Sequence, residues 1–111
     1  GAANAAVNVA SLGGNSLAIG VIGKDSNGFA LRQSLIESKV NCDFLIESDS
    51  FQTTTKVRVL AGHEFSPRQQ MIRIDYENQT AFDTEIINRL KQNIISAIEN
   101  ANAVVISDYN Y

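Results

Sequence analysis

Residues 17–46 read LAIGVIGKDSNGFALRQSLIESKVNCDFLI. This stretch starts with a short apolar run, continues with apolar residues at helical spacing, and ends with a second short apolar run. Short runs of this kind, rich in β-branched residues, are typical of strands buried in a parallel sheet. Asp25, Ser26 or Asn27 can cap the helix between the two runs. The stretch therefore predicts a strand, a helix and a second strand in succession.

Further helices lie on both sides of this unit in the sequence. Residues 2–12 are almost continuously apolar and mostly small, which favours a helix that is buried on most of its circumference. In residues 83–100, isoleucine and leucine recur at helical spacing, and Asp83 is a suitable N-cap. Residues 103–106 predict a last buried strand that ends near Asp108. The alternation predicts an α/β fold with a mainly parallel sheet flanked by helices on both faces.

The periodicity changes between these parts of the chain. Residues 53–60 (TTTKVRVL) and 69–75 (QQMIRID) alternate with period two, and turn-forming residues occur in 61–68 between them. This pattern predicts an antiparallel hairpin with a long loop, lying as a small flap beside the main sheet. One face of the predicted flap carries Val57, Val59, Ile72 and Ile74, and the other carries Lys56, Arg58, Gln69, Met71, Arg73 and Asp75.

The composition excludes several classes of protein. The net charge of −3 gives no reason to expect a nucleic-acid partner. No apolar run approaches the roughly 18 residues of a membrane span. The single cysteine, Cys42, excludes an internal disulfide and a cysteine-only metal site. We therefore expect a cytoplasmic protein that binds neither nucleic acid nor membranes and holds no metal through this segment.

Two segments resemble the ribokinase-like sugar kinases of the PfkB family. These are residues 1–13, which begin GAAN, and residues 20–28 (GVIGKDSNG). The resemblance implies a ribokinase-like fold with a β-hairpin lid. It also implies that the backbone N–H groups of Gly1 and Ala2 approach the acceptor sugar and that Asn4 hydrogen-bonds a sugar hydroxyl. A simple polar start to the helix is the alternative interpretation of Asn4.

Three more segments are similar to a narrower group of enzymes. Residues 53–59 and 69–75 look like the flap of heptose 7-phosphate kinases, the kinase domains of ADP-heptose synthases, and residues 105–109 resemble another segment of them. The resemblance implies transfer of a phosphoryl group from ATP, with Mg²⁺, to the anomeric hydroxyl of heptose 7-phosphate. That reaction belongs to the synthesis of lipopolysaccharide core precursors. A homodimer through the flap is implied as well.

The same resemblance implies that the catalytic base and most of the ATP site lie C-terminal to this segment. We therefore expect no catalytic residue among residues 1–111 and no kinase activity from these residues alone. On this interpretation they are a fragment of a single kinase domain. Residues 1–52 and 81–111 belong to the α/β core, and residues 53–80 form the flap hairpin and its connection.

The polar face of the flap is the most informative candidate site. Lys56, Arg58 and Arg73 converge there, with Gln69 nearby. Guanidinium groups match phosphate oxygens, so this face suits a phosphorylated substrate. The alternative is a solvated face with cross-strand ion pairs, and only the family resemblance favours phosphate binding over it. Asp108 would orient the sugar from a strand end, or would simply cap a turn.

Other functions stay open. A kinase of the same superfamily that acts on ribose, fructose or a nucleoside is the first alternative, although a neutral acceptor gives no reason for three cations on the flap. A non-catalytic module that binds a sugar phosphate is the second. A nucleotide-binding Rossmann domain is the weakest, because the glycine spacing of a dinucleotide fingerprint is missing.

Overall fold

The computed structural model describes residues 1–62, 69–78 and 81–108. Most of the connection predicted at 61–68 and the end of the segment at 105–109 therefore lie outside the described residues. The elements follow one another as α1 (Ala2–Ser11), β1 (Leu17–Gly23), α2 (Ser26–Glu37), β2 (Asn41–Ser48), β3 (Thr55–Ala61), β4 (Gln69–Tyr76) and α3 (Thr84–Ile98).

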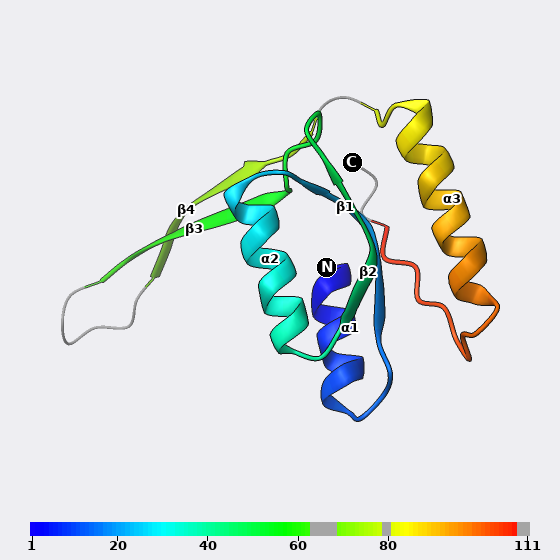
Figure 1. The fold of residues 1–111 in the computed structure, drawn as a ribbon. Helices are drawn as coiled ribbons and strands as arrows, with labels where there is room; N and C mark the ends of the chain where they lie inside the picture. The colour runs from blue at the N-terminus through cyan, green and yellow to red at the C-terminus, as the bar shows by residue number, and fades with distance from the viewer. Residues whose placement is uncertain (63–68, 79–80, 109–111) are drawn as a thin grey trace.

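The predicted strand–helix–strand unit is confirmed. β1 and β2 are parallel and pair from Ile19 opposite Phe44 to Gly23 opposite Ser48. Figure 1 shows α1 and α2 on one side of these strands and α3 on the other side. The molecule is therefore an α/β protein with helices on both faces of a parallel sheet.

The core lies mainly between the sheet and the first two helices. Leu35, Val40 and Cys42 form a buried cluster, against which small residues of α1, among them Ala3 and Ala6, are packed. Burial raises the pKa of the Cys42 thiol. Small side chains let α1 lie close to its neighbours, as the composition of residues 2–12 indicates.

The prediction that α1 is buried on most sides is wrong. None of its residues is fully buried, and Asn4, Asn8 and Val9 are exposed. Among the described residues, α1 packs mainly against β1, α2 and the buried cluster around Cys42, so one of its faces is covered while Asn4, Asn8 and Val9 stay exposed.

The prediction of a last buried strand at 103–106 is also wrong. In the described part of the chain these residues pair with no strand, and Val104, Val105 and Ile106 are 58%, 73% and 86% exposed. A strand requires a partner for its backbone groups, and β1 and β2 pair only with each other among the described residues. The apolar composition of residues 103–106 indicates strand propensity but does not indicate whether a neighbouring strand is available for pairing.

The predicted hairpin is confirmed. β3 and β4 are antiparallel and form a two-stranded sheet that projects from the α/β body (Figure 1). The register shifts between Val59 and Leu60, which leaves Met71 as an extra residue in β4. This irregularity is a β-bulge, and it exchanges the faces of all residues that precede it in β4.

The bulge corrects the predicted place of Gln69. Gln69 lies opposite Ala61, on the face of Val57 and Val59, whereas Gln70 lies opposite Leu60 on the face of Arg58. Alternation within a regular strand had predicted the reverse. Gln70, and not Gln69, therefore shares a face with the cations.

None of the described helices has the length and apolar character needed to cross a membrane.

Candidate functional site

The cationic face of the hairpin, formed by Lys56, Arg58 and Arg73, is the first part of the candidate site. Lys56 lies opposite Asp75, and Arg58 lies opposite Arg73 in the register of β3 and β4. Residues directly opposite each other in an antiparallel pair have neighbouring side chains on one face of the sheet. The structure thus brings the three predicted cations together.

Carboxylates neutralise two of these cations. The Lys56 ammonium lies 3.5 Å from a carboxylate oxygen of Asp75 and 3.0 Å from one of Glu77, and Nε of Arg73 lies 3.0 Å from Asp75. The cross-strand ion pairing expected for a solvated face is therefore present. Sequence reasoning counted Asp75 but missed Glu77, which follows β4 and reaches back to Lys56.

Arg58 differs from the other two cations. Within the described ranges, no carboxylate forms an ion pair with Arg58, and its direct cross-strand neighbour is a second arginine. Like charges directly opposite each other in a sheet are destabilising. Among the described residues of this face, three cations and two carboxylates leave an excess of one positive charge, centred on Arg58.

The second part of the candidate site is the edge of the sheet at the carboxyl ends of β1 and β2. In open α/β sheets, ligands bind beyond this edge. Lys24 and Asp49 follow the two strands and form an ion pair of 2.6 Å between Nζ and Oδ2. A shallow cavity of about 320 Å³ beside this pair is lined in part by Asp25, Gln52 and Asn78.

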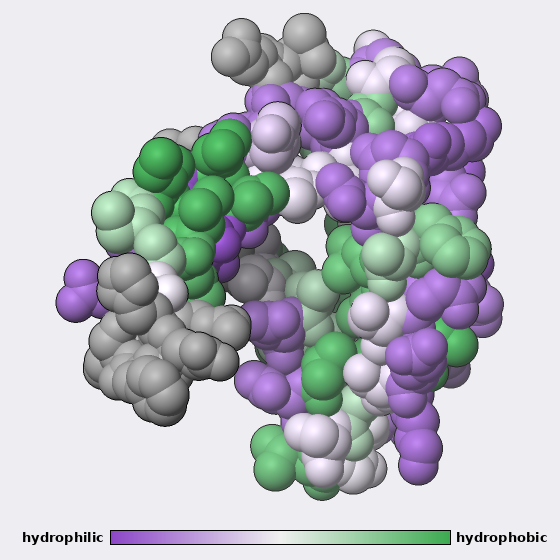
Figure 2. Space-filling view, turned by 90° about the vertical axis from the view of Figure 1, so that its left-hand side faces the viewer, coloured by the Kyte–Doolittle hydropathy of each residue, from purple (hydrophilic) through white to green (hydrophobic). Residues whose placement is uncertain are grey.

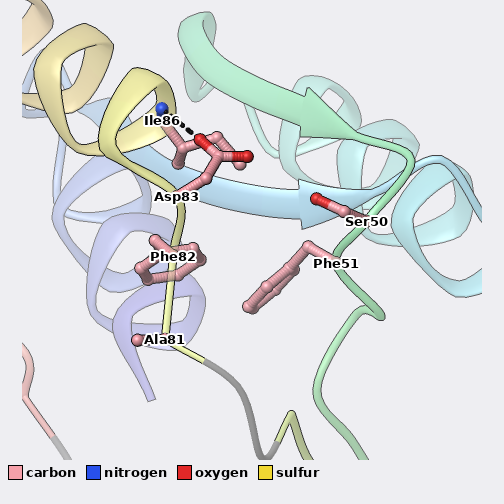
Figure 3. Close-up of a pocket in the computed structure, with 6 residues that line it drawn as sticks. All are labelled: Ser50, Phe51, Ala81, Phe82, Asp83 and Ile86. Atoms are coloured by element: carbon pink, nitrogen blue, oxygen red, sulfur yellow. Dashed lines mark hydrogen bonds between the residues drawn. The ribbon is translucent and has the colours of Figure 1, made fainter.

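A smaller pocket of about 200 Å³ adjoins this edge, where α3 begins (Figure 3). The rings of Phe51 and Phe82 stack there at 4.9 Å between centroids. Asp83 caps α3, because its side chain accepts a hydrogen bond of 2.8 Å from the backbone N–H of Ile86. The predicted N-cap is thereby confirmed, and the pocket has a structural aromatic pair at its wall.

The remaining predicted site residues lie on other parts of the chain. Gly1 is the N-cap residue of α1 and makes no side-chain cap, and the backbone N–H of Asn4 donates to the Gly1 carbonyl at 3.0 Å. Ala2, Asn4 and Asp108 are exposed. Their predicted contacts with a sugar stay predictions.

A parallel α/β layer with a projecting two-stranded flap is the architecture of a ribokinase-like protein. Residues 1–109 match the pfkB family of carbohydrate kinases, so the chain belongs to that family.

Relatives of known description agree with this assignment. The chain is 41% identical over 111 residues to the bifunctional protein HldE of Vibrio atlanticus (strain LGP32) and 38% identical over 109 residues to HldE of Pasteurella multocida (strain Pm70). Each match covers 98% of this chain, which spans 21% of the length of those relatives.

Solved structures show the same fold. The chain superposes on a fructokinase from Vibrio cholerae O395 in apo form with a TM-score of 0.56 at 30% identity, over 73% of this chain and 26% of that chain. A fructokinase from Xylella fastidiosa gives 0.54 at 29% identity, over 78% and 26% of the two chains.

Proposed function

We propose that the complete protein is an ATP-dependent sugar kinase that phosphorylates the anomeric hydroxyl of heptose 7-phosphate, and that this segment binds the acceptor sugar. The proposal rests on one observation, the uncompensated positive charge at Arg58 on the cationic face. A guanidinium that faces a second guanidinium is suited to a phosphate, whose oxygens accept hydrogen bonds from both. The likeness to the bifunctional protein HldE supports a member of this kinase family, and the resemblance of the flap segments to heptose 7-phosphate kinases suggests the phosphorylated heptose as the acceptor.

In this proposal the residues of the flap act by binding and enclosure. Arg58 meets the phosphate of the acceptor first, because Lys56 and Arg73 are already paired with carboxylates. Closure of the flap over the sugar would exclude water from the reacting groups. Asn4 and Asp108 would orient sugar hydroxyls, as the resemblance implies.

The nucleotide is assigned to no residue of this segment. In the described ranges, no group of three histidine, cysteine, aspartate or glutamate side chains could hold a metal ion. When bound elsewhere in the complete protein, ATP would supply the phosphoryl group and Mg²⁺ would neutralise the charge that develops during its transfer. We therefore derive no step of phosphoryl transfer from the residues described.

A screen of acceptors with the complete gene product tests the proposal. ATP turnover would be measured with heptose 7-phosphate, ribose, fructose and adenosine, for the wild type and for Arg58→Ala, Arg73→Ala and Arg32→Ala. Arg32 is a matched control, because it pairs with Glu47 on the α/β body at 3.1 Å and not on the flap.

The expected result is selective turnover of heptose 7-phosphate. Loss of one charge-assisted hydrogen bond raises the KM for this acceptor about 10- to 100-fold in Arg58→Ala, and less in Arg73→Ala. Arg32→Ala should match the wild type. Turnover of an unphosphorylated sugar that is indifferent to Arg58 and Arg73 would overturn the assignment of the acceptor.

An unphosphorylated hexose is the second candidate acceptor. Its support is the likeness to two fructokinases at 30% and 29% identity. A neutral hexose would leave the cationic face without a role. The Arg58→Ala and Arg73→Ala variants of the same screen therefore distinguish a hexose acceptor from a sugar phosphate.

We also propose that the complete protein is a homodimer through the hairpin. The apolar face opposite the cations is exposed, with Val57, Val59, Ile72 and Ile74 between 40% and 57% accessible. Figure 2 shows apolar side chains gathered over this part of the molecule. Light scattering of the complete wild-type protein should give the mass of a dimer. The variant Ile72→Lys should give a monomer, whereas the control Phe29→Lys on α2 should remain a dimer. A monomeric wild type would contradict the proposal.

A further inference from the structure

The junction between the hairpin and the α/β body is held by one carboxylate, that of Asp25. Oδ1 of Asp25 accepts a hydrogen bond of 2.7 Å from the backbone N–H of Gly28 and so caps α2. Oδ2 accepts a second hydrogen bond of 2.8 Å from the backbone N–H of Thr53, just before β3 begins. Sequence reasoning identified the first contact as a helix cap and missed the second.

Two more hydrogen bonds join the same corner to the start of β3. The backbone N–H of Gly23 donates to Oγ1 of Thr53 at 2.9 Å, and Nδ2 of Asn27 donates to Oγ1 of Thr55 at 3.0 Å. Thr53 is only 5% exposed, so its polar groups depend on these partners. The loop from β1 to α2 therefore fixes the point at which the hairpin leaves the body.

Glycines make room for this contact. A Cβ on Gly28 would collide with the Gly23 carbonyl and with Oγ1 of Thr53, and a Cβ on Gly23 would collide with Asp25 and with the Phe51 carbonyl. The spacing of Gly23, Asp25 and Gly28 thus has a steric explanation. It allows the backbone before β3 to lie directly against the corner.

The segment that follows β4 is hydrogen-bonded to the same part of the chain. The side-chain amide of Asn78 accepts from the backbone N–H of Gln52 at 2.8 Å and donates to the Gln52 carbonyl at 2.5 Å. Gln52 precedes Thr53, so both ends of the hairpin converge on the segment that Asp25 holds. Asp25 is the only carboxylate among these described contacts.

We propose that Asp25 is a positioning residue, which fixes the direction of the hairpin relative to the α/β body and thereby places Arg58 over the acceptor. The direction of the hairpin does not depend on the proposed function, whereas the placement of Arg58 over the acceptor rests on it. Lys56 lies three residues beyond Thr53, so a change of direction at Thr53 moves the cationic face directly.

Serine variants separate the cap from the second hydrogen bond. Asp25→Ser retains one oxygen that can accept from Gly28, but it cannot also accept from Thr53. Asp83→Ser is the matched control, because Asp83 caps α3 through the same kind of contact and forms no hydrogen bond with the described residues of the hairpin. Asn27→Ala is a second test variant at an exposed position, and it removes only the contact with Thr55.

Hydrogen exchange of the complete protein and acceptor kinetics are the two measurements. Amides of residues 55–61 and 69–76 should exchange several-fold faster in Asp25→Ser, to a smaller degree in Asn27→Ala, and unchanged in Asp83→Ser. The KM for the phosphorylated acceptor should rise about tenfold in Asp25→Ser, because Arg58 would no longer be held at the phosphate. The kcat should stay within about twofold of the wild type, because Arg58 contributes to binding and not to the chemical step.

The two halves of the inference fail in different ways. Unchanged exchange of the hairpin in both Asp25→Ser and Asn27→Ala, or an equal increase in Asp83→Ser, would overturn the positioning role. Faster exchange of the hairpin in an enzyme that ignores phosphorylated sugars would retain the positioning role and overturn the proposed acceptor. Faster exchange with an unchanged KM for a phosphorylated sugar would overturn the link to Arg58.

Discussion

At the scale of single residues, the pair formed by Arg58 and Arg73 has a measurable electrostatic consequence. Two opposed guanidinium groups, of which only Arg73 pairs with a carboxylate among the described residues, favour an added anion. We expect inorganic phosphate to raise the melting temperature of the complete protein, since a ligand that binds only the folded state contributes about 2.7 kcal/mol at one hundred times its Kd. Arg58→Ala should lose most of this shift, and Arg32→Ala should retain it.

We expect Asp75 to compete with such an anion. Its carboxylate lies 3.0 Å from Nε of Arg73 and 3.5 Å from the ammonium of Lys56. In Asp75→Asn both cations lose this partner, so the KM for heptose 7-phosphate should fall several-fold, while kcat/KM for a neutral sugar should not change. An increased KM would show that Asp75 orders the cations and does not compete with the substrate.

The lowered pKa of Asp25 predicts a dependence of stability on pH. Hydrogen bonds from the backbone N–H groups of Thr53 and Gly28 hold the pKa of this carboxyl below its ordinary value of 3.8. A depressed pKa stabilises the folded state above pH 3.8, and this contribution is lost as the pH falls further through the folded-state pKa. In urea unfolding, the difference in the free energy of unfolding between the wild type and Asp25→Asn should therefore shrink as the pH falls below 3.8. A difference that stays constant from neutral pH to acid would contradict the ionic role.

At the scale of elements, glycine positions in β1 and α2 give a matched pair of variants. Gly28→Ala places a methyl group against the Gly23 carbonyl and Thr53, whereas Gly20→Ala meets nothing within 4 Å. We expect Gly28→Ala to lower the free energy of unfolding by about 1–3 kcal/mol, as overpacking does, and Gly20→Ala to change it by less than about 1 kcal/mol. Chemical denaturation of the complete protein measures both, and equal effects would refute the steric argument.

Elements that depend on local periodicity could be predicted from the sequence. The apolar runs that became β1 and β2, the alternation of β3 and β4, and the Asp83 cap of α3 all follow from neighbouring residues. The family resemblance followed from the order of such segments. The cations on the hairpin could also be assigned to one face, because Arg58 and Arg73 lie on the regular side of the bulge.

Features that depend on distant partners could not be predicted in this way. The bulge at Met71 is a property of cross-strand pairing, so the face of Gln69 was assigned wrongly. Residues 104–106 have strand composition, but no described strand pairs with them. The hydrogen bond from Thr53 to Asp25 spans 28 residues, and no pattern in the sequence marks it.

At the scale of the whole molecule, the surface is larger than that of a compact protein of the same mass. The accessible surface is 8558 Å² at 12.1 kDa, whereas about 6,000 Å² is typical of a folded monomer. The radius of gyration is 16.2 Å, compared with about 13 Å for a compact domain of this length. The projecting hairpin and the exposed apolar side chains account for the difference (Figures 1 and 2).

Exposed apolar side chains of α3 and of the segment after it contribute to this surface. Ile94, Ile95 and Ile98 are 40%, 64% and 50% exposed, and Val105 is 73% exposed. Exposed apolar area of this extent promotes association. We expect residues 1–111 expressed alone to self-associate in light scattering and to show no ATP turnover with any acceptor. A monodisperse, active polypeptide would contradict both expectations.

The narrow junction at Asp25 and Thr53 also bears on how such enzymes diversify. Because the described contacts between hairpin and body are concentrated at a few side chains of one corner, substitutions farther out on β3 and β4 leave the packing of β1, β2 and α2 intact. Substitutions in the hairpin can therefore change which ligand it binds without compensating substitutions in the α/β body. We therefore expect that grafting the hairpin between related kinases would change which acceptor they prefer.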